Sequence, residues 1–506
     1  MTTVNTDCEQ WSRRARGLRL ETRPLIDGVF GESRSGSRYN NVNPATEETL
    51  VEAYAGSAED VNEAVSRARR AFRDGRWSGL SPQERAEALL KLTHLFLENR
   101  EELALLDSLD VGKPISQALG EVDMACGYLK FAAESCDKLL DDVIPSPRSM
   151  LVLNVREPVG VVGAILPWNF PMVVVALKIA PALAVGNSVV VKPSELSPLS
   201  ALRIGALALQ AGIPAGVLNV VPGLAATVGR AMAEHGGIDM LTFTGSTATG
   251  KVLMQSAGRS NLKKVLLECG GKSPHIVFAD ASDLDAAAAD VVEQITWNQG
   301  QVCVAGSRLL VEASIEEELV RRVVERMRAI RPNDPLDPST TFGPLVSADH
   351  LRKVTGYIDS AQTSGARLRA GGRRLERRGY FLEPTVFDHV RPDTPIASEE
   401  IFGPVLSVLT FDTAAEAIEL AHSVEYGLSA RIWTRDTGLG YQLARELRAG
   451  EVTINAGVPS APGVGAAAAT EPFGHSGFGV EGGLEGVRQY TRLKSIHLNL
   501  PSRQTP

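Results

Sequence analysis

The sequence is poor in cysteine and contains no long apolar run. Its 506 residues include five cysteines, an odd number spread along the chain, which argues against a disulfide framework and fits a reducing compartment. The longest apolar stretches, such as residues 159–166, are only as long as a strand, and residues 1–5 lack the charged and then apolar pattern of a signal peptide. We therefore expect a cytoplasmic protein without a membrane partner.

Runs of lysine and arginine are also missing. The net charge of −8 argues against nucleic acid as a partner, and we expect no bound metal. Hydrophobic residues make up 44% of the chain and charged residues 22%, as in soluble globular proteins. The length is sufficient for roughly three domains with a large buried core.

Short apolar runs that end at glycine or proline alternate with helical stretches over most of the chain. This alternation is typical of parallel, doubly wound sheets, and it predicts two α/β domains. The first domain is expected to bind a cofactor and the second to carry Cys303. The runs form two sets, at residues 159–166, 188–191, 217–221 and 240–244, and then at 275–278, 308–311 and 405–409.

Outside these runs, residues 24–30 are predicted to form a strand entering a hairpin, and residues 58–140 are predicted to be helical. The polar and arginine-rich residues 1–23 are interpreted as a peripheral arm. Residues 458–470, rich in alanine, glycine and proline, are predicted to form a mobile surface loop.

Cys303 lies in a polar turn with Gly300 and Gly306 on its two sides. Glycines let backbone amides approach the sulfur, and amides that point at a thiolate lower its pKa and favour a nucleophile. The alternative is an ordinary core cysteine, because free cysteine is often buried. Glu268 lies a short distance upstream, so a carboxylate is available to the same site.

A second candidate site follows the strand at residues 240–244. The strand ends at Gly245, and Ser246 is well placed to cap a helix whose free amides would bind an anion such as a pyrophosphate. Gly245 to Lys251 also reads G-x-x-x-x-G-K, which suggests a phosphate-binding NTPase, but Val252 stands where that motif needs Ser or Thr. A plain strand-to-helix turn without a ligand is the third interpretation.

Lys192 and Glu195 follow a buried strand at the edge of the sheet where open α/β folds bind ligands. A carboxylate there suits the paired hydroxyls of an adenosine ribose and repels a 2′-phosphate. Glu195 therefore favours NAD over NADP, although NADP stays possible. Without a ligand, the two residues would form a solvated pair at a strand end.

Four segments, at residues 166–171, 191–195, 266–273 and 298–308, carry distinctive motifs in a fixed order along the chain. Together they resemble the NAD(P)-dependent aldehyde dehydrogenase superfamily, and the resemblance extends from about residue 24 to about residue 496. It implies two doubly wound parallel-sheet domains plus a small oligomerisation sheet. In this division residues 1–140 and 159–269 bind NAD, 270–487 form the catalytic domain, and 141–158 and 488–506 form the oligomerisation arm. The segments are Leu166-Pro167-Trp168-Asn169-Phe170-Pro171, Val191-Lys192-Pro193-Ser194-Glu195, Leu266-Leu267-Glu268-Cys269-Gly270-Gly271-Lys272-Ser273 and residues 298–308.

The resemblance also implies a mechanism. Cys303 attacks an aldehyde to give a thiohemiacetal, whose oxyanion is stabilised by the Asn169 side chain and the Cys303 amide. Hydride passes to NAD, and Glu268 activates the water that hydrolyses the thioester, a role that suits a carboxylate whose pKa is raised by burial. Lys178 is a candidate proton relay from Glu268, and Glu481 is a weaker candidate of the same kind.

Further residues are assigned to ligands by the same resemblance. Lys192 and Glu195 are expected at the adenosine ribose, and Glu400 and Phe402 at the nicotinamide ribose and ring. The full cofactor set is Ile165, Pro167, Trp168, Lys192, Glu195, Gly223, Gly245, Ser246, Gly271, Glu400 and Phe402. The substrate pocket is expected to contain Phe170, Leu177, Trp297, Val302 and Val304.

Departures from the family pattern bear on the substrate. Leu177 stands where many relatives carry an aromatic residue, which suggests a wide substrate pocket. The family's usual stretch is shortened at residues 472–477, so the outer wall of the pocket is not predicted by the resemblance. The chain is most similar to the subgroup that oxidises aminoaldehydes and their γ-glutamyl conjugates. Asp107 and Asp110 are candidates to attract an amine at the pocket entrance, or are helix-end carboxylates.

Other substrates and products are less favoured. Aromatic or aliphatic aldehydes are the alternative with the same mechanism. No complete aromatic cage for betaine aldehyde is evident. Formation of acyl-CoA is disfavoured because Glu268, which activates water, is present.

Residues 142–157 and the tail at 489–500 resemble the two arms of the family's oligomerisation sheet. Residues 495–500 would otherwise expose alternating apolar side chains on an edge strand, and pairing with another subunit removes that exposure. We expect a dimer or a tetramer.

Overall fold

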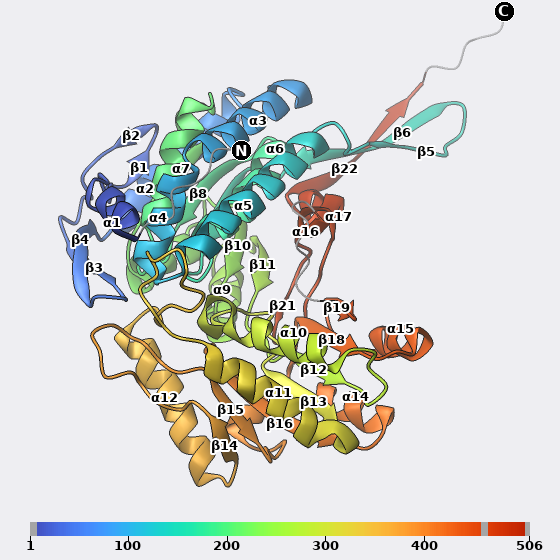
Figure 1. Ribbon diagram of the computed structural model, residues 1–506. Helices are drawn as coiled ribbons and strands as arrows, with labels where there is room; N and C mark the ends of the chain where they lie inside the picture. The colour runs from blue at the N-terminus through green and yellow to red at the C-terminus, as the bar shows by residue number, and fades with distance from the viewer. Residues whose placement is uncertain (1–7, 457–463, 501–506) are drawn as a thin grey trace, which may run out of the picture.

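The computed structural model describes residues 8–456 and 464–500, and Figure 1 shows their arrangement. Two large sheets with helices packed against them form the body of the molecule, and a three-stranded sheet extends away from it. Two small two-stranded sheets complete the strands: β3 (Arg38–Asn43) with β4 (Glu48–Tyr54), and β17 (Tyr426–Gly427) with β20 (Phe473–Gly474).

The first sheet has the order β2-β1-β9-β8-β7-β10-β11-β21, with the central strands from β9 to β11 parallel. It comprises β1 (Leu25–Ile26), β2 (Val29–Phe30), β7 (Val161–Ile165), β8 (Ser188–Lys192), β9 (Leu218–Val220), β10 (Met240–Thr244), β11 (Lys264–Glu268) and β21 (Gly477–Phe478). The helices of this part are α2 (Ala58–Arg73), α3 (Pro82–Glu98), α4 (Arg100–Val111), α5 (Ile115–Ser135), α6 (Pro171–Ala184), α7 (Leu199–Gln210), α8 (Arg230–Glu234) and α9 (Thr247–Arg259).

Alternating side chains of β8 show why both faces of this sheet are covered. Val189 and Val191 join the core cluster that contains residues of α6 and α7, whereas Val190 joins a second cluster with residues of α2, α8 and α9. A strand with apolar residues on both faces is buried between two layers. The prediction of a doubly wound parallel sheet is confirmed.

The second sheet has the order β14-β15-β16-β13-β12-β18-β19 and is parallel except at β14. Its strands are β12 (Pro274–Val277), β13 (Arg308–Glu312), β14 (Arg367–Ala370), β15 (Thr385–Asp388), β16 (Val405–Phe411), β18 (Ser429–Trp433) and β19 (Glu451–Ile454). Its helices are α10 (Leu284–Thr296), α11 (Glu316–Ala329), α12 (Ala348–Thr363), α13 (Pro395–Ser398), α14 (Ala414–His422) and α15 (Thr437–Glu446). The prediction of two α/β sheets is therefore confirmed.

The three-stranded sheet consists of β5 (Asp142–Ile144), β6 (Met150–Pro158) and β22 (Thr491–Asn499), with β6 in the middle. It extends from the body beyond α17 (Gly483–Gln489), as Figure 1 shows. Leu493 and Leu498 of β22 are 59% and 46% exposed. The small sheet expected from the resemblance is present.

Two expectations about irregular segments need correction. Residues 8–16 form helix α1 (Cys8–Arg16), and Trp11 is only 1% exposed, so this part of the segment is docked on the body and is not a peripheral arm. Within the predicted loop at 458–470, residues 464–467 form the short helix α16 (Val464–Ala467), in which Ala466 is buried. Residues 1–7 and 457–463 lie outside the described part of the chain.

None of the five cysteines forms a disulfide in the described part of the chain. In residues 8–456 and 464–500, no helix has both the length and the apolar character that crossing a bilayer requires.

Candidate active site

The predicted site residues meet at the carboxyl edge of the first sheet. Ile165, the last residue of β7, lies opposite Lys192 of β8 on one side and Phe243 of β10 on the other, and Thr244 lies opposite Glu268. The carboxyl ends of neighbouring parallel strands form the ligand crevice in open α/β folds. The general base candidate and the cofactor candidates therefore share one edge.

The cysteine loop, residues 298–306, enters this edge from the second sheet with an unusual backbone. Asn298, Gln299 and Gly300 have φ values of 45°, 58° and 69°, so three successive residues are left-handed. For a residue other than glycine this conformation costs about 1–3 kcal/mol and persists only where neighbours enforce it. Here a Cβ on Gly300 would lie 2.5 Å from the backbone of Gly403, so the loop is held by close packing.

Asn169 is tied directly to the cysteine loop. Its side-chain Nδ2 donates to the carbonyl of Gln301 at 2.9 Å, and its own carbonyl accepts from Asn298 Nδ2 at 3.0 Å. The residue is only 5% exposed. Because an amide carries two N–H donors, one remains for an oxyanion beside Cys303.

Lys113 is a residue of this site for which the sequence analysis proposed no role. Its Nζ donates to the Asn169 carbonyl at 3.0 Å, forms an ion pair with Glu121, and lies 4.1 Å from the centre of the Phe170 ring. Lys113 is 0% exposed. The lysine thus fixes both the oxyanion candidate and its aromatic neighbour.

The electrostatic surroundings of Cys303 contradict one expectation. Burial and the carboxylates of Glu400 and Glu268 raise the pKa of the Cys303 thiol to about 12, although the amides of Val304 and Cys303 act in the opposite direction. The amides therefore act in the predicted direction, but they do not give the thiol a low pKa in the protein without ligands. Desolvation and two nearby anions outweigh two amide dipoles, so a base must take the thiol proton.

Glu268 is the general base candidate of this site. Burial, then the charge of Glu481, raises the pKa of Glu268 well above its usual value, while Lys178 opposes the shift. Its Oε1 is buried and has no hydrogen-bond partner in the described residues. The expected direction of the pKa shift is confirmed.

Lys178 and Glu481 form a pair behind this carboxylate. The Lys178 ammonium is 0% exposed and donates to Glu481, whose side chain is 12% exposed. Both candidates for a proton relay therefore lie together, and both influence the pKa of Glu268.

The shortened stretch at residues 472–477 supports the Glu268 strand. Gly477 and Phe478 of β21 pair with Glu268 and Leu267 of β11. The Ser476 hydroxyl donates to the Gly270 carbonyl at 2.7 Å and accepts from the Gly427 amide at 3.0 Å. The stretch thus holds the backbone on both sides of the general base candidate.

The start of α9 has the geometry expected of an anion site. Ser246 is the N-cap and accepts from the Thr249 amide at 3.2 Å. Residues 247–250 already belong to α9, so no extended loop encloses a phosphate and Lys251 is exposed on the helix. The NTPase interpretation is therefore wrong, whereas the predicted cap is confirmed.

Other groups at this edge fit a dinucleotide. Thr244 Oγ1 is buried without a hydrogen-bond partner in the described residues, so it is free for a ligand. Gly223 has φ +149°, and a Cβ there would lie 2.7 Å from Val228, which only glycine avoids. Lys192 Nζ lies 3.0 Å from Glu195 Oε2, and the Glu195 carboxylate stays one-third exposed. We define the cofactor cradle as the ends of β8 and β10 together with the start of α9.

Glu400 and Phe402 lie between the two sheets. The Gly271 amide donates to Glu400 Oε1 at 2.9 Å, and a Cβ on Gly271 would lie 2.3 Å from the Cys303 carbonyl oxygen. The Phe402 ring meets the Trp168 ring edge to face at 5.3 Å. Gly271, Trp168, Glu400 and Phe402 are thus brought together as expected, and Pro167 precedes Trp168 in the segment between β7 and α6.

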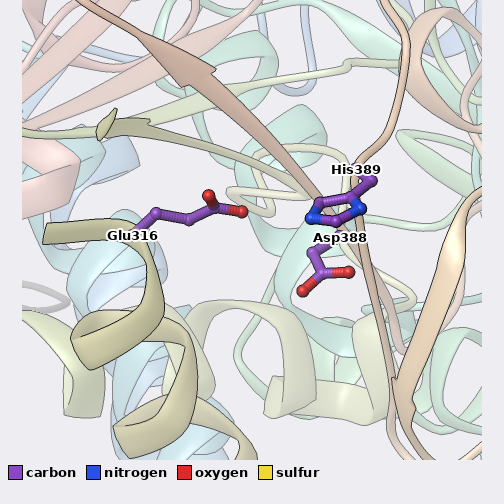
Figure 2. Close-up of side chains that lie close together, drawn as sticks. All are labelled: Glu316, Asp388 and His389. Atoms are coloured by element: carbon purple, nitrogen blue, oxygen red, sulfur yellow. The ribbon is translucent and has the colours of Figure 1, made fainter. Parts of the chain in front are cut away.

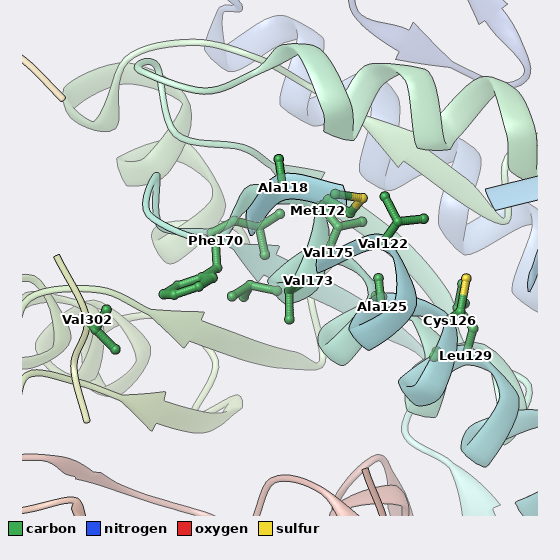
Figure 3. Close-up of a cluster of buried hydrophobic side chains, with 14 of the residues drawn as sticks. Ala118, Val122, Ala125, Cys126, Leu129, Phe170, Met172, Val173, Val175 and Val302 are labelled. Atoms are coloured by element: carbon green, nitrogen blue, oxygen red, sulfur yellow. The ribbon is translucent and has the colours of Figure 1, made fainter. Parts of the chain in front are cut away.

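The predicted substrate residues fall into two places. Phe170 and Trp297 have ring centroids 5.0 Å apart, and Figure 3 shows Val302 of the cysteine loop on the Phe170 side of the apolar cluster. Val304 packs partly buried against the same core. Leu177 instead lines a small pocket of about 20 Å³, together with Tyr128, Phe131, Val480 and Glu481, and none of the other four predicted residues lines it.

Asp107 and Asp110 do not lie at an entrance. They are 0% and 1% exposed, and they accept hydrogen bonds from the Met172 and Leu199 amides at the starts of α6 and α7. Burial raises the pKa of both carboxyls. They are therefore structural caps, and attraction of an amine by either residue is excluded.

One cluster outside this edge has metal-ligand types: Glu316, Asp388 and His389, shown in Figure 2. The Asp388 carboxylate already binds the guanidinium groups of Arg367, at 2.7 Å, and Arg369. Two cations at the carboxylate oppose a third, so the group is an ion-pair network and does not support a metal site.

Comparisons with known proteins match nearly the whole chain. The profile described as "Aldehyde dehydrogenase family" matches residues 30–496. The aminoacetaldehyde dehydrogenase of Pseudomonas aeruginosa is 46% identical over 496 residues, which is 97% of this chain and 98% of that protein.

Two solved structures are equally similar. An indole-3-acetaldehyde dehydrogenase in complex with NAD⁺ is 47% identical and superposes with a TM-score of 0.95 over 97% of this chain and 99% of the other. A gamma-glutamyl-gamma-aminobutyraldehyde dehydrogenase from Burkholderia cenocepacia J2315 is 44% identical, with a TM-score of 0.95 over 98% of this chain and 100% of the other.

Proposed function

Because the chain belongs to the aldehyde dehydrogenase family, we propose that Cys303, Glu268 and Asn169 are the catalytic residues of its reaction. The protein is an NAD-dependent enzyme that oxidises an aldehyde to the carboxylic acid. The observation that carries the assignment of residues is the bond from Asn169 Nδ2 to the Gln301 carbonyl, which joins the oxyanion donor to the cysteine loop.

The first half of the reaction uses Cys303 and Asn169. The Cys303 thiol gives its proton to solvent, and the sulfur then attacks the aldehyde carbon to form a thiohemiacetal. The second N–H of the Asn169 side chain and the Cys303 amide stabilise the oxyanion. NAD held in the cofactor cradle would supply the hydride acceptor, and Cys303 would then carry the acyl group as a thioester.

The second half uses Glu268 as the base for water. A carboxyl with a raised pKa takes a proton from water more readily, and the Lys178–Glu481 pair carries that proton away. The product acid then leaves Cys303. The CoA-transfer alternative stays disfavoured because this carboxylate is in place.

We assign NAD to the cofactor cradle, with the pyrophosphate at Ser246 and the start of α9. Glu195 receives the adenosine ribose, and Glu400 and Phe402 receive the nicotinamide ribose and ring. The partly exposed Glu195 carboxylate and the unpartnered Thr244 hydroxyl support this placement. In this assignment the NAD-binding domain is 1–140 with 159–269, the catalytic domain is 270–487, and the arm is 141–158 with 488–506.

For the substrate, an aminoaldehyde or a γ-glutamyl conjugate is the first candidate, because two of the similar proteins carry such names. An aromatic aldehyde is the second. The pocket beside Leu177 is lined by Tyr128 and Phe131, and the relative that is 47% identical is named for indole-3-acetaldehyde.

For assembly we propose a dimer or tetramer built through the three-stranded sheet. The exposed Leu493 and Leu498 support this, because apolar residues on an outer strand are stabilised by a second subunit. The absence of disulfides among the five cysteines agrees with a cytoplasmic location. A monomer in sedimentation at micromolar concentration would contradict the assembly.

The test is NADH formation by the purified protein with NAD, or with NADP, across aliphatic, aromatic, amino- and carboxy-aldehydes, with and without CoA. Cys303→Ala is expected to form no NADH. Glu268→Gln is expected to give a burst of NADH followed by little turnover, because hydrolysis of the thioester fails. An active Cys303→Ala protein would refute the nucleophile assignment, and no turnover on any aldehyde would refute the function.

A further inference from the structure

Helix α12 packs one of its faces along the segment that carries Glu400 and Phe402. Lys353 Nζ donates to the Glu400 carbonyl at 3.4 Å, and a Cβ on Gly403 would lie 2.8 Å from a methyl of Val354. On its other side the segment contacts the cysteine loop, where a Cβ on Gly300 would meet the Gly403 carbonyl. The segment is therefore held between α12 and the nucleophile's loop.

His350 lies in the first turn of α12. Its hydrogen bond to the backbone of the segment that carries Glu400 and Phe402 is shorter than the one from Lys353. The His350 Nε2 lies 2.7 Å from the Phe402 carbonyl oxygen. Since a carbonyl can only accept, the hydrogen resides on Nε2. Burial lowers the pKa of His350 to about 4, so the ring is neutral and keeps this tautomer at neutral pH.

The Phe402 backbone needs such a restraint. Its φ is +61°, a left-handed conformation that is rare for a bulky residue and persists only where contacts enforce it. The His350 ring also meets the Trp168 ring at 5.4 Å, while Trp168 meets Phe402 at 5.3 Å. One imidazole therefore contacts both aromatic residues assigned to the cofactor.

We propose that His350 is a positioning residue for the nicotinamide end of the cofactor, acting through its hydrogen bond to the strained Phe402 backbone. The proposal rests on the proposed function, because Phe402 and Trp168 are cofactor residues only within it. His350 itself needs no contact with substrate or cofactor. Without the hydrogen bond from His350, Phe402 can leave the left-handed conformation, so a smaller fraction of the free protein is in the form that binds NAD.

The experiment compares two substitutions that separate the hydrogen bond from the ring. His350→Phe keeps an aromatic ring between Trp168 and Phe402 but has no donor, whereas His350→Gln keeps an N–H donor without the ring. Arg352→Gln is the matched control, because Arg352 is exposed on the same helix and its guanidinium pairs, among the described residues, with Asp349. NAD binding to each resting protein is measured by calorimetry, with thermal unfolding to verify the fold.

We expect the Kd for NAD to rise about fivefold to tenfold in His350→Phe, the loss expected for one hydrogen bond. His350→Gln and Arg352→Gln are expected to stay within about twofold of the wild type. In steady state, the KM for NAD rises in His350→Phe while the KM for aldehyde does not. A merely structural role would not produce this split together with rescue by Gln.

The proposal is overturned if a folded His350→Phe protein binds NAD as tightly as the wild type. It is also overturned if Gln weakens binding and Phe does not, since the ring would then act without the bond. If His350→Phe does not fold, His350→Leu is measured in its place with the same two criteria. Failure of the wild type itself to bind NAD would refute the proposed function instead.

Discussion

The cysteine loop and the cofactor cradle lie at the same sheet edge but are built in opposite ways. In the cradle, strands end, a serine caps a helix, and the helix amides stay accessible, so regular secondary structure creates the site. In the cysteine loop, three successive left-handed residues are held by side chains from distant parts of the chain. A binding site can thus rest on regular local geometry, whereas the chemical site depends on strain and burial imposed by tertiary packing.

The largest loss of stability is expected from substitution of Lys113, the buried lysine that supports the cysteine loop through Asn169. Lys113→Met removes the partner of buried Glu121 and the donor to the Asn169 carbonyl, and breaking such a pair costs about 3–5 kcal/mol of unfolding free energy. Burial already raises the pKa of Glu121 to about 7, and loss of Lys113 raises it further. The pKa of Glu121 is then higher in the folded protein than in the unfolded chain, so folding favours the protonated carboxyl. The destabilisation of Lys113→Met therefore grows as pH rises through the folded-state pKa of Glu121.

Denaturant unfolding of Lys113→Met at several pH values measures this effect. The double substitution Lys113→Met/Glu121→Leu is the control, since it removes both charges and is expected to recover most of the loss. Equal stability of the wild type and the single variant at high pH would show that the pair does not support the loop.

Asn169→Ala tests the other support of the same loop. Loss of one oxyanion donor typically costs on the order of a hundredfold or more in kcat. Because the side chain is one partner in a bond to Gln301, unfolding must be measured alongside the kinetics. A folded variant with nearly normal kcat would exclude Asn169 from oxyanion stabilisation.

The raised thiol pKa predicts slow alkylation of Cys303 at neutral pH. Since the Glu400 carboxylate contributes to that pKa of about 12, Glu400→Gln lowers it and increases the thiolate fraction. Iodoacetamide is therefore expected to react severalfold faster with the variant in the absence of NAD. Cys303→Ala serves as the blank for the other cysteines, and an unchanged rate would contradict the electrostatic account.

The Lys178–Glu481 pair behind Glu268 predicts that two substitutions shift the pH profile of kcat in opposite directions. Glu268 must be ionised to act as a base, so activity falls as pH drops through its raised pKa. Lys178 lowers that pKa and Glu481 raises it. Lys178→Met should therefore move the acid limb of the kcat profile to higher pH, and Glu481→Gln should move it to lower pH. Shifts in the same direction would refute this arrangement.

The smallest effect is expected in the cofactor cradle. Ser246→Ala removes one capping bond on an exposed helix start and costs about 1 kcal/mol of stability. NAD binding should weaken only modestly, because the backbone amides remain. Ser246→Asp, which also caps but adds a negative charge, should weaken NAD binding much more while keeping stability, and calorimetry distinguishes the two.

The contrast between the cofactor cradle and the cysteine loop also explains which features of the site could be predicted from the sequence. The strand at 240–244, its end at Gly245 and the cap at Ser246 were predicted correctly, because strand periodicity and capping involve residues within a few positions of each other. Leu177 was assigned to the substrate pocket together with Phe170, and the structure places it in a pocket that Phe170 does not line. The role of Asp107 and Asp110 was not decided by sequence either, because burial is a property of the packed fold.

By itself, the sequence determined the alternation of strands and helices, the chemical groups Cys303 and Glu268, and the family to which they belong. The strands and helices follow from local periodicity, and the family follows from the order and separation of the motifs along the chain. The tertiary structure decided that the thiol has a high pKa, that Lys113 and Asn298 hold Asn169, and that His350 restrains Phe402. The bonded residues are far apart, 132 positions for Asn169 and Gln301, and only folding sets their distance and removes water from between them.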